Sequence, residues 1–230
     1  MSTQALILAA GRGERMRPLT DHHPKPLLQV QGKPLIVWHL ERLARAGVTD
    51  VVINTAWLEE QFPAALGDGS AFGLRIRYSH EGARFGGALE TAGGIATALP
   101  LLQDAPFWLV AGDVFMPGFD FPVADAQRFS ASSALAHIYL VPNPPHNPKG
   151  DFGISAGGLA LSQADEKFTY STAGLYRPDL FRDTPAGQKA ALAPLLRQAM
   201  HNGDVSAALY SGAWTDVGTP ERLAELNSPR

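Results

Sequence analysis

Residues 8–20 read Leu-Ala-Ala-Gly-Arg-Gly-Glu-Arg-Met-Arg-Pro-Leu-Thr, and this stretch decides the fold. It begins inside a short apolar run, residues 5–10, which predicts a buried β-strand. Gly11 and Gly13 follow at once and let the backbone adopt positive φ, with N–H groups turned toward an anion. Ligands of open α/β sheets bind beyond the carboxyl ends of the strands. The loop is therefore predicted to hold phosphates.

The loop is also locally basic, in a chain whose net charge is −3. Residues 12–33 carry a net charge of +3, from Arg12, Arg15, Arg17, Lys25 and Lys33 against Glu14 and Asp21. Such a local excess favours an anion site over the alternative, a strand-to-helix loop with surface arginines. Two common phosphate motifs are excluded. A G-x-G-x-x-G pattern would need glycine where Met16 stands, and a G-x-x-x-x-G-K-[ST] run does not occur.

Outward from this loop, short apolar runs alternate with helical patterns. Strands are predicted at 5–10, 51–54, 74–79 and 107–111, and helices from Pro34 to Gly47 and at 57–66 and 89–99. The second half is less regular, with strands at 134–141 and 206–210 and helices at 192–201 and from Thr219. Between them lie four short runs expected to be antiparallel strands, at 152–155, 159–161, 168–170 and 173–176. We therefore predict an α/β, Rossmann-like fold: a mostly parallel sheet with helices on both faces and a small antiparallel insertion.

Composition limits the possible functions. The chain has 230 residues, 45% of them hydrophobic and 18% charged, which suits a single folded domain over residues 1–230. The mild negative charge argues against nucleic acid as a partner, and the absence of cysteine excludes disulfides, zinc ribbons and thiol catalysis. No apolar run approaches the length of a membrane span, and the N-terminus lacks the features of a signal peptide. We expect a cytoplasmic monomer that acts on small molecules.

Residues 8–20, called the signature loop from here on, continue into a longer pattern. Pro24-Lys-Pro-Leu-Leu28 and Gly32-Lys-Pro-Leu35 follow them. This composite pattern resembles the signature of the sugar-1-phosphate nucleotidyltransferases, and the resemblance covers nearly the whole chain. It implies that Gly11, Arg12 and Gly13 cradle the nucleotide phosphates. It further implies that Arg15 binds the departing pyrophosphate, and that Lys25 binds the α-phosphate region, the sugar phosphate or both.

Two aspartates are candidate metal ligands. Asp113 follows the predicted strand 107–111, and Asp216 lies in Trp214-Thr-Asp-Val-Gly-Thr219, before the last helix. By themselves they could be a turn residue and a source of N-terminal helix electrostatics. Beside a triphosphate loop, two carboxylates suit Mg²⁺, which prefers few protein oxygens plus substrate phosphates. The resemblance implies that both hold Mg²⁺. A sugar 1-phosphate is already an anionic nucleophile near neutral pH, so no catalytic base is needed.

Residues 80–94 hold five glycines around the start of the third helix and are predicted to read the base, with Glu81 as a nucleotide contact; the alternative is a flexible surface loop. Three further segments read Leu89-Glu-Thr-Ala-Gly-Gly94, Ile53-Asn-Thr-Ala-Trp-Leu58 and Lys149-Gly-Asp-Phe152. In these segments the chain most resembles, within the family, uridylyltransferases that act on N-acetylmuramate 1-phosphate in peptidoglycan recycling. That resemblance makes Asn54, Asn143 and Asp151 candidate sugar contacts, and divides the chain into a nucleotide-binding half (about 1–115) and a half for the sugar and second metal ligand (about 116–230). Mannose-1-phosphate guanylyl transfer and glucose-1-phosphate thymidylyl or uridylyl transfer remain open. A glycosyltransferase ranks lower because no D-x-D motif occurs, and a non-catalytic nucleotide sensor also ranks lower.

Overall fold

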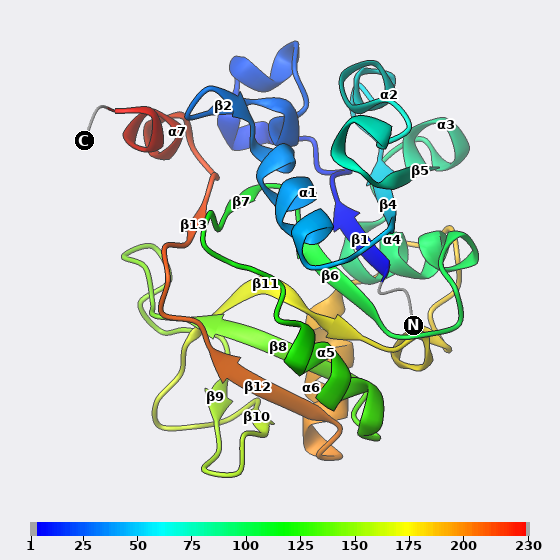
Figure 1. Cartoon of the computed structure of the whole chain (residues 1–230). Coiled ribbons are helices and arrows are strands. Elements are labelled where there is room, and N and C mark those ends of the chain that lie inside the picture. The colour runs from blue at the N-terminus through cyan, green and yellow to red at the C-terminus, as the bar shows by residue number, and fades with distance from the viewer. Residues whose placement is uncertain (1–3, 229–230) are drawn as a thin grey trace.

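The computed structural model describes residues 4–228, and its centre is a seven-stranded sheet in the order β12-β8-β11-β6-β1-β4-β5 (Figure 1). Every neighbouring pair in this sheet is parallel except those made by β11, which runs antiparallel to both β6 and β8. Three two-stranded antiparallel sheets accompany it, β9 with β10, β7 with β13 and β2 with β3. The predicted fold class, a mostly parallel α/β sheet with small antiparallel additions, is confirmed.

The strands and helices have the following bounds. The strands are β1 (Gln4–Leu8), β2 (Gln29–Val30), β3 (Lys33–Pro34), β4 (Asp50–Thr55), β5 (Arg75–His80), β6 (Phe107–Ala111), β7 (Val114–Phe115), β8 (Ala136–Val141), β9 (Gly153–Ile154), β10 (Ala160–Leu161), β11 (Thr169–Tyr176), β12 (Val205–Leu209) and β13 (Thr215–Asp216). The helices are α1 (Leu35–Arg45), α2 (Gln61–Leu66), α3 (Glu81–Phe85), α4 (Glu90–Ala98), α5 (Val123–Ala131), α6 (Leu192–His201) and α7 (Pro220–Asn227). None of the helices within residues 4–228 is long and apolar enough to cross a bilayer.

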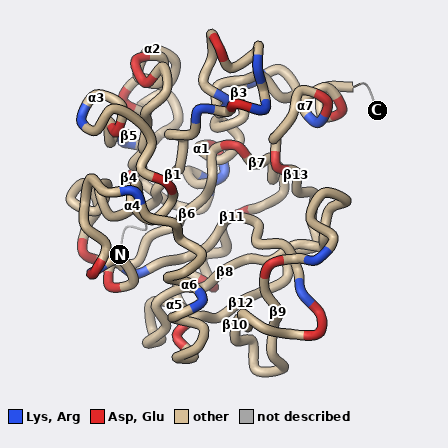
Figure 2. The backbone as a smooth tube through the Cα atoms, turned by 180° about the vertical axis from the view of Figure 1, so that it is seen from behind, with Lys and Arg blue, Asp and Glu red and all other residues tan. Residues whose placement is uncertain are grey.

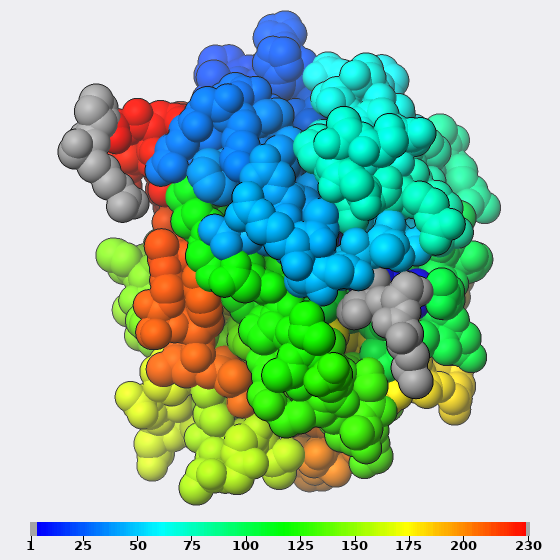
Figure 3. Space-filling model, in the orientation of Figure 1, coloured from blue at the N-terminus to red at the C-terminus, as the bar shows by residue number. Residues whose placement is uncertain are grey.

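Each face of the sheet is covered by its own set of helices. Side chains along a strand point alternately to the two faces, so in β1 Ile7 joins the core under α1, α2 and α5, whereas Leu6 joins the core under α4 and α6. The long apolar stripe of α1 is fully buried at Ile36 and Leu40. In the space-filling view α1 and α5 cover most of one face, and the edge strand β12 stays visible beside them (Figure 3).

The strand order places a crevice at the centre of the sheet. From β1 the chain adds β4 and then β5 on one side, whereas β6 is added on the other side of β1. Helices that follow strands on opposite sides of such a switch point cover opposite faces, so a crevice opens beyond the strand ends. Leu8 of β1 pairs with Ala111 of β6, so the signature loop and Asp113 leave the sheet side by side.

Two local predictions were wrong in their bounds. Residues 57–60 form a turn, and the helix predicted from Trp57 begins only at Gln61. The runs predicted as separate strands at 168–170 and 173–176 are one strand, β11, interrupted by a bulge between Tyr170 and Gly174. The bulge includes Thr172, whose φ of 62° is unusual for a β-branched residue. Because β11 lies in the main sheet, this part of the chain is not a separate insertion.

A third, smaller core fixes the signature loop to the C-terminal part of the chain. Met16, between Arg15 and Arg17, is fully buried and packs with Leu35, Phe115, Val217 and Leu223. These residues come from the loop, α1, the β7–β13 ribbon and α7. The helix α7 begins at Pro220, after Thr219, whose side chain accepts a hydrogen bond from the backbone N–H of Arg222. The C-terminal segment thereby positions the loop that carries Arg15.

Candidate active site

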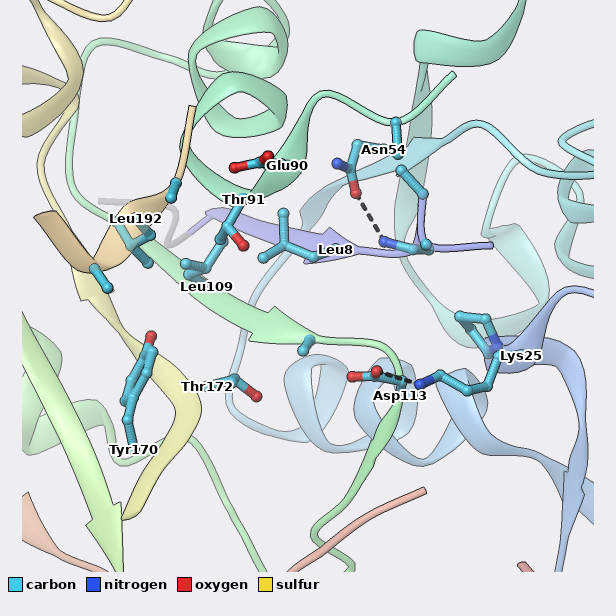
Figure 4. Close-up of a pocket in the computed structure, with 18 of the residues that line it drawn as sticks. Leu8, Lys25, Asn54, Glu90, Thr91, Leu109, Asp113, Tyr170, Thr172 and Leu192 are labelled. Atoms are coloured by element: carbon cyan, nitrogen blue, oxygen red, sulfur yellow. Dashed lines mark hydrogen bonds and ion pairs between the residues drawn. The ribbon is translucent and has the colours of Figure 1, made fainter. Parts of the chain in front are cut away.

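The crevice contains a pocket of about 510 Å³ (Figure 4). One wall is the signature loop, from Leu8 to Gly13, and the opposite wall is the segment of Ala88, Glu90 and Thr91 at the start of α4. The remaining lining residues come from the turn at residues 25–26, from β4, β6, β11 and α6, and from segments beside them: Lys25, Pro26, Asn54, Leu109, Ala111, Asp113, Phe152, Tyr170, Thr172, Ala191, Leu192, Ala193 and Leu196. The pocket therefore joins parts of the chain that are up to 188 residues apart in sequence, Leu8 and Leu196.

The backbone of the signature loop faces this pocket. Gly13 has a φ of 69°, and its carbonyl accepts a hydrogen bond from the Thr20 hydroxyl at 2.8 Å, which closes the loop. A Cβ built on Gly13 would lie 3.0 Å from Thr20 Cγ2, so a larger residue would be crowded as well as strained. A Cβ on Gly11 would meet no protein atom within 4 Å. At Gly11 the open space belongs to the pocket, where a ligand can approach the backbone.

Three of the five basic side chains are held by neighbouring protein groups. The Arg12 guanidinium stacks on the ring of Trp57, 3.4 Å from its centroid, and donates to the carbonyl of Thr20 at 3.0 Å. Arg17 pairs with Asp21 at 2.8 Å, and Lys33 pairs with Glu41 in α1. Basic and acidic positions are correspondingly mixed along the loop beside β3 (Figure 2). Of the five basic residues, the structure directs Lys25 into the pocket and Arg15 toward the β7–β13 side.

Lys25 and Asp113 form an ion pair in the pocket, with 2.6 Å between Nζ and Oδ2 (Figure 4). The residue after Asp113, Val114, is contacted by His39, a buried residue of α1. The His39 Nε2 atom lies 2.8 Å from the Val114 carbonyl oxygen. Burial lowers the pKa of His39 to about 4, so the ring is neutral at pH 7 and donates from Nε2. This contact fixes the start of β7 and with it the position of the Asp113 carboxylate.

The second aspartate is brought beside the first by the β7–β13 ribbon. Asp216 pairs with Val114, and the N–H of Val217 donates to the Asp113 carbonyl at 2.9 Å. Arg222 Nη1 donates to Asp216 Oδ2 at 2.5 Å. The other oxygen, Oδ1, is buried; His146 Nε2 lies 2.8 Å from it, yet no donor in residues 4–228 is aligned to hydrogen-bond it. On the same side, the Arg15 guanidinium lies 3.4 Å from the point that a Cβ of Gly218 would occupy.

Asn54 forms part of the pocket wall, and Glu81 lies behind it. Glu81 is completely buried, and its two oxygens accept hydrogen bonds from Asn54 Nδ2 at 2.6 Å and from the N–H of Leu89 at 2.8 Å. Asn54 is 2% exposed and lines the pocket, and its Oδ1 accepts from the N–H of Ala9 at 2.7 Å (Figure 4). Glu81 therefore braces the segment around it and does not face the pocket.

Asn143 and Asp151 lie in another hydrogen-bonded network, outside the residues that line the pocket. Asn143 Nδ2 donates to the carbonyl of Lys167 at 2.8 Å, and its Oδ1 accepts from the hydroxyl of Thr169 at 2.9 Å. Asp151 Oδ2 accepts from the N–H of Tyr170 at 2.8 Å. These bonds fasten the proline-rich loop to the start of β11 and place Phe152 and Tyr170 in the pocket wall.

Several pocket residues carry no signal in the sequence. Leu192 and Leu196 have the spacing of an ordinary core-facing helix, and here that face also forms part of the pocket. Tyr170 and Thr172 reach the pocket through the bulge in β11, which no residue pattern indicates. His146 meets Asp216 across 70 residues of sequence.

The arrangement is suited to binding a phosphorylated ligand. The backbone after β1 and the Lys25 side chain offer hydrogen bonds and positive charge, and the carboxylates of Asp113 and Asp216, at the β7–β13 ribbon, offer hard oxygen ligands for a cation. The described residues contain no cluster of three or more His, Cys, Asp or Glu that could hold a metal by themselves. A metal bound between these aspartates would need further oxygens from a ligand.

Comparison with known proteins agrees with this geometry. Residues 4–229 match the family described as nucleotidyl transferase. The chain is 53% identical to an N-acetylmuramate alpha-1-phosphate uridylyltransferase of Neisseria meningitidis serogroup B, over 98% of this chain and 97% of that one. It is 34% identical to the protein of the same name from Caulobacter vibrioides, over 96% of this chain and 97% of that one.

The fold is also similar to that of a solved structure. A Bacillus anthracis protein described as a putative glucose-1-phosphate thymidylyltransferase, solved with sucrose, superposes with a TM-score of 0.82 at 21% identity, over 99% of this chain and 94% of that one. The signature loop, the family match over nearly the whole chain and the two full-length relatives lead to one conclusion. The chain belongs to the sugar-1-phosphate nucleotidyltransferase family.

Proposed function

We propose that this enzyme transfers UMP from UTP to N-acetylmuramate 1-phosphate in a Mg²⁺-dependent reaction, giving UDP-N-acetylmuramate and pyrophosphate. The observation that carries the reaction class is the Lys25–Asp113 pair beside the open backbone of Gly11, at the switch point of the sheet. The names of the full-length relatives support the choice of substrates. The reaction would serve peptidoglycan recycling. We further propose that the enzyme is a cytoplasmic monomer whose partners are its small-molecule substrates.

The residues present fit a divalent cation. The buried Oδ1 of Asp216 has His146 Nε2 at 2.8 Å but no aligned hydrogen-bond donor among residues 4–228, and a bound cation would satisfy such an oxygen. Asp113 and Asp216 are hard oxygen donors, and Mg²⁺ commonly takes one or two carboxylates, water and substrate phosphates. When bound there, Mg²⁺ would neutralise charge on the phosphates and orient them.

The chain's own residues would act mainly by positioning and by charge. An oxygen of the sugar phosphate attacks the α-phosphorus of UTP, a new P–O bond forms, and the bond to the pyrophosphate oxygen breaks. In our proposal the Lys25 ammonium holds the phosphate oxygens around the reacting centre, and Arg15 holds the departing pyrophosphate. Backbone N–H groups near Gly11 and Gly13 bind the nucleotide phosphates. No side chain has to remove a proton, because the sugar phosphate is largely dianionic above a pKa of about 6.

The substrate assignment is tested by pyrophosphate release with UTP, GTP, dTTP and ATP, each against N-acetylmuramate, N-acetylglucosamine, glucose and mannose 1-phosphates. We expect the largest kcat/KM for UTP with N-acetylmuramate 1-phosphate. A preference for GTP with mannose 1-phosphate, or for dTTP or UTP with glucose 1-phosphate, would show that the proposed substrates are wrong. The reaction would still be that of a sugar-1-phosphate nucleotidyltransferase. UTP binding without release from any pair would instead support a nucleotide sensor. Loss of release in EDTA, restored by Mg²⁺, tests the metal.

Thr172 supplies a prediction from backbone strain. A β-branched residue at positive φ is strained by about 1–3 kcal/mol, and such strain is found at functional sites. Thr172 lines the pocket, so we infer that the bulge aims its side chain at the substrate (Figure 4). For Thr172→Gly we expect an unchanged or raised Tm, because glycine adopts this φ freely, together with a fall in kcat/KM of about tenfold.

The matched control is Gln31→Gly, since Gln31 also has positive φ, at 51°, but lies in the β2–β3 turn away from the active-site pocket. Its kcat/KM should stay at the wild-type value. Thermal melts and steady-state kinetics on both variants give the answer. Unchanged kinetics in Thr172→Gly would show that the strained residue has no role in the reaction.

A further inference from the structure

Glu81 is a buried carboxylate that faces no cation among residues 4–228. Its side chain is 0% exposed, and its partners are the Asn54 amide and the N–H of Leu89. Among the described residues, the ionisable group that acts on it through charge is another acid, Glu59, and burial raises the pKa of Glu81. The N–H of Leu89 lies at the N-terminus of α4, where the helix dipole favours a negative charge. An apolar residue would fill the same space without the cost of desolvating a carboxylate.

The carboxylate is one part of a chain of hydrogen bonds between the two walls of the pocket. The N–H of Ala9 donates to Asn54 Oδ1 at 2.7 Å, and Asn54 Nδ2 donates to Glu81 Oε1 at 2.6 Å. Glu81 Oε2 then accepts from the N–H of Leu89 at 2.8 Å. Ala9 leads into the signature loop, and Leu89 lies between Ala88 and Glu90 of the opposite wall.

The helix α4 is shaped around this pair. A Cβ built on Gly94 would lie 2.6 Å from Asn54 Nδ2 and 2.7 Å from Glu81 Oε1, so even alanine would collide with both polar atoms. The absence of a side chain at this position lets the helix pack directly on the pair. Close packing against α4 therefore fixes the orientation and spacing of the Asn54 and Glu81 side chains, in addition to their hydrogen bonds.

We propose that Asn54 and Glu81 are positioning residues, which set the separation of the two pocket walls and so align the nucleotide between them. This inference rests on the proposed function. Phosphates held by the signature loop and a base held by residues 88–91 would both be displaced if either bond of the chain were broken. Because small displacements in a reacting complex have large effects on rate, the pair should influence nucleotide use without touching the reacting atoms.

An exchange of the two functional groups tests this directly. In Asn54→Asp a carboxylate faces the carboxylate of Glu81, and in Glu81→Gln one of the two donors, Asn54 Nδ2 or the Leu89 N–H, loses its acceptor. The double variant, Asn54→Asp with Glu81→Gln, satisfies every bond again. The carboxylate introduced at position 54 accepts from the N–H of Ala9 and from the amide introduced at position 81, whose oxygen accepts from the N–H of Leu89.

We expect each single variant to raise the KM for UTP and lower kcat/KM by at least about tenfold, and the double variant to return to within about threefold of wild type. Hydrogen exchange at the Leu89 amide should be faster in Glu81→Gln and slow again in the double variant. This second measurement does not depend on catalysis. If the wild type releases no pyrophosphate with any substrate pair, the proposed function is wrong, yet exchange at Leu89 still reports whether the two groups act together.

The control is a buried polar side chain at the other end of β1, Gln4. Gln4 is 1% exposed; its Nε2 donates to the Gln103 carbonyl at 2.8 Å, and its Oε1 accepts from the N–H of Gln103 at 2.7 Å. Gln4→Leu should lower Tm without changing the KM for UTP. The proposal is overturned if the single variants keep the wild-type KM for UTP. It is also overturned if the folded double variant has a kcat/KM no higher than that of the less active single variant.

Discussion

Asp113→Asn is expected to lower kcat by about a thousandfold or more, because it removes charge where the proposed reaction requires a cation beside the phosphates. In the structure this carboxylate lies 2.6 Å from Lys25 Nζ, and the neutral ring of His39 contacts the carbonyl of the next residue, Val114. Asparagine keeps the shape but offers one neutral oxygen and one donor. The loss should appear in single-turnover measurements at saturating UTP and Mg²⁺, with Tm close to that of the wild type.

Asp120→Asn is the matched control, since Asp120 is an exposed aspartate whose partner is Arg42, away from the pocket. It should retain wild-type kcat. Asp216→Asn should resemble Asp113→Asn, because the buried Oδ1 is the oxygen that a cation would satisfy. If either active-site variant keeps near-wild-type kcat at saturating Mg²⁺, that aspartate is not a metal ligand.

Lys25→Ala is the second large effect, and we expect kcat/KM to fall by about a hundredfold to a thousandfold. Among residues 4–228, Lys25 is the one basic residue that lines the pocket. Arg12, Arg17 and Lys33 are held by other partners. Only 12% of the Lys25 side chain is exposed, so solvent screens its charge little. Removing it would also leave Asp113 without its partner.

Lys33→Ala provides the comparison for Lys25. Lys33 stacks on Trp38 and pairs with Glu41, so its loss should lower Tm and leave kcat/KM unchanged. Kinetics should be measured while varying UTP at fixed sugar phosphate, and then the reverse. A Lys25→Ala enzyme with wild-type kcat/KM for both substrates would contradict a role for Lys25 at either phosphate.

Local pattern was enough to predict most of the fold. The predicted helix over 192–201 matches α6, and the strand over 107–111 matches β6. Gly47 ends the first helix with a φ of 81°, as its position after the apolar stripe indicated. The bulge in β11 could not be predicted, because Thr172 takes a backbone conformation that its own chemistry disfavours and that the neighbouring strands impose.

The roles of individual side chains were harder to infer from sequence. Arg12 and Glu81 are both predicted nucleotide contacts, yet the first stacks on Trp57 and the second is buried between Asn54 and Leu89. A motif specifies which residues gather at a strand end. It does not specify which of them hydrogen-bond to one another and which are left for a ligand, because that depends on atoms contributed from distant segments.

By itself, therefore, the sequence determined the mostly parallel sheet and singled out the glycine-rich loop and the two aspartates as a candidate site, since these follow from periodicity and from residue types at fixed spacing. The roles of this loop and of the aspartates stay predictions. The tertiary structure decided the rest. Pairing of β7 with β13 joins Asp113 and Asp216 across about a hundred residues, and burial turns Asn54 and Glu81 into a brace. Both outcomes depend on long-range packing, which brings chain segments to distances and dielectric environments that no local pattern encodes.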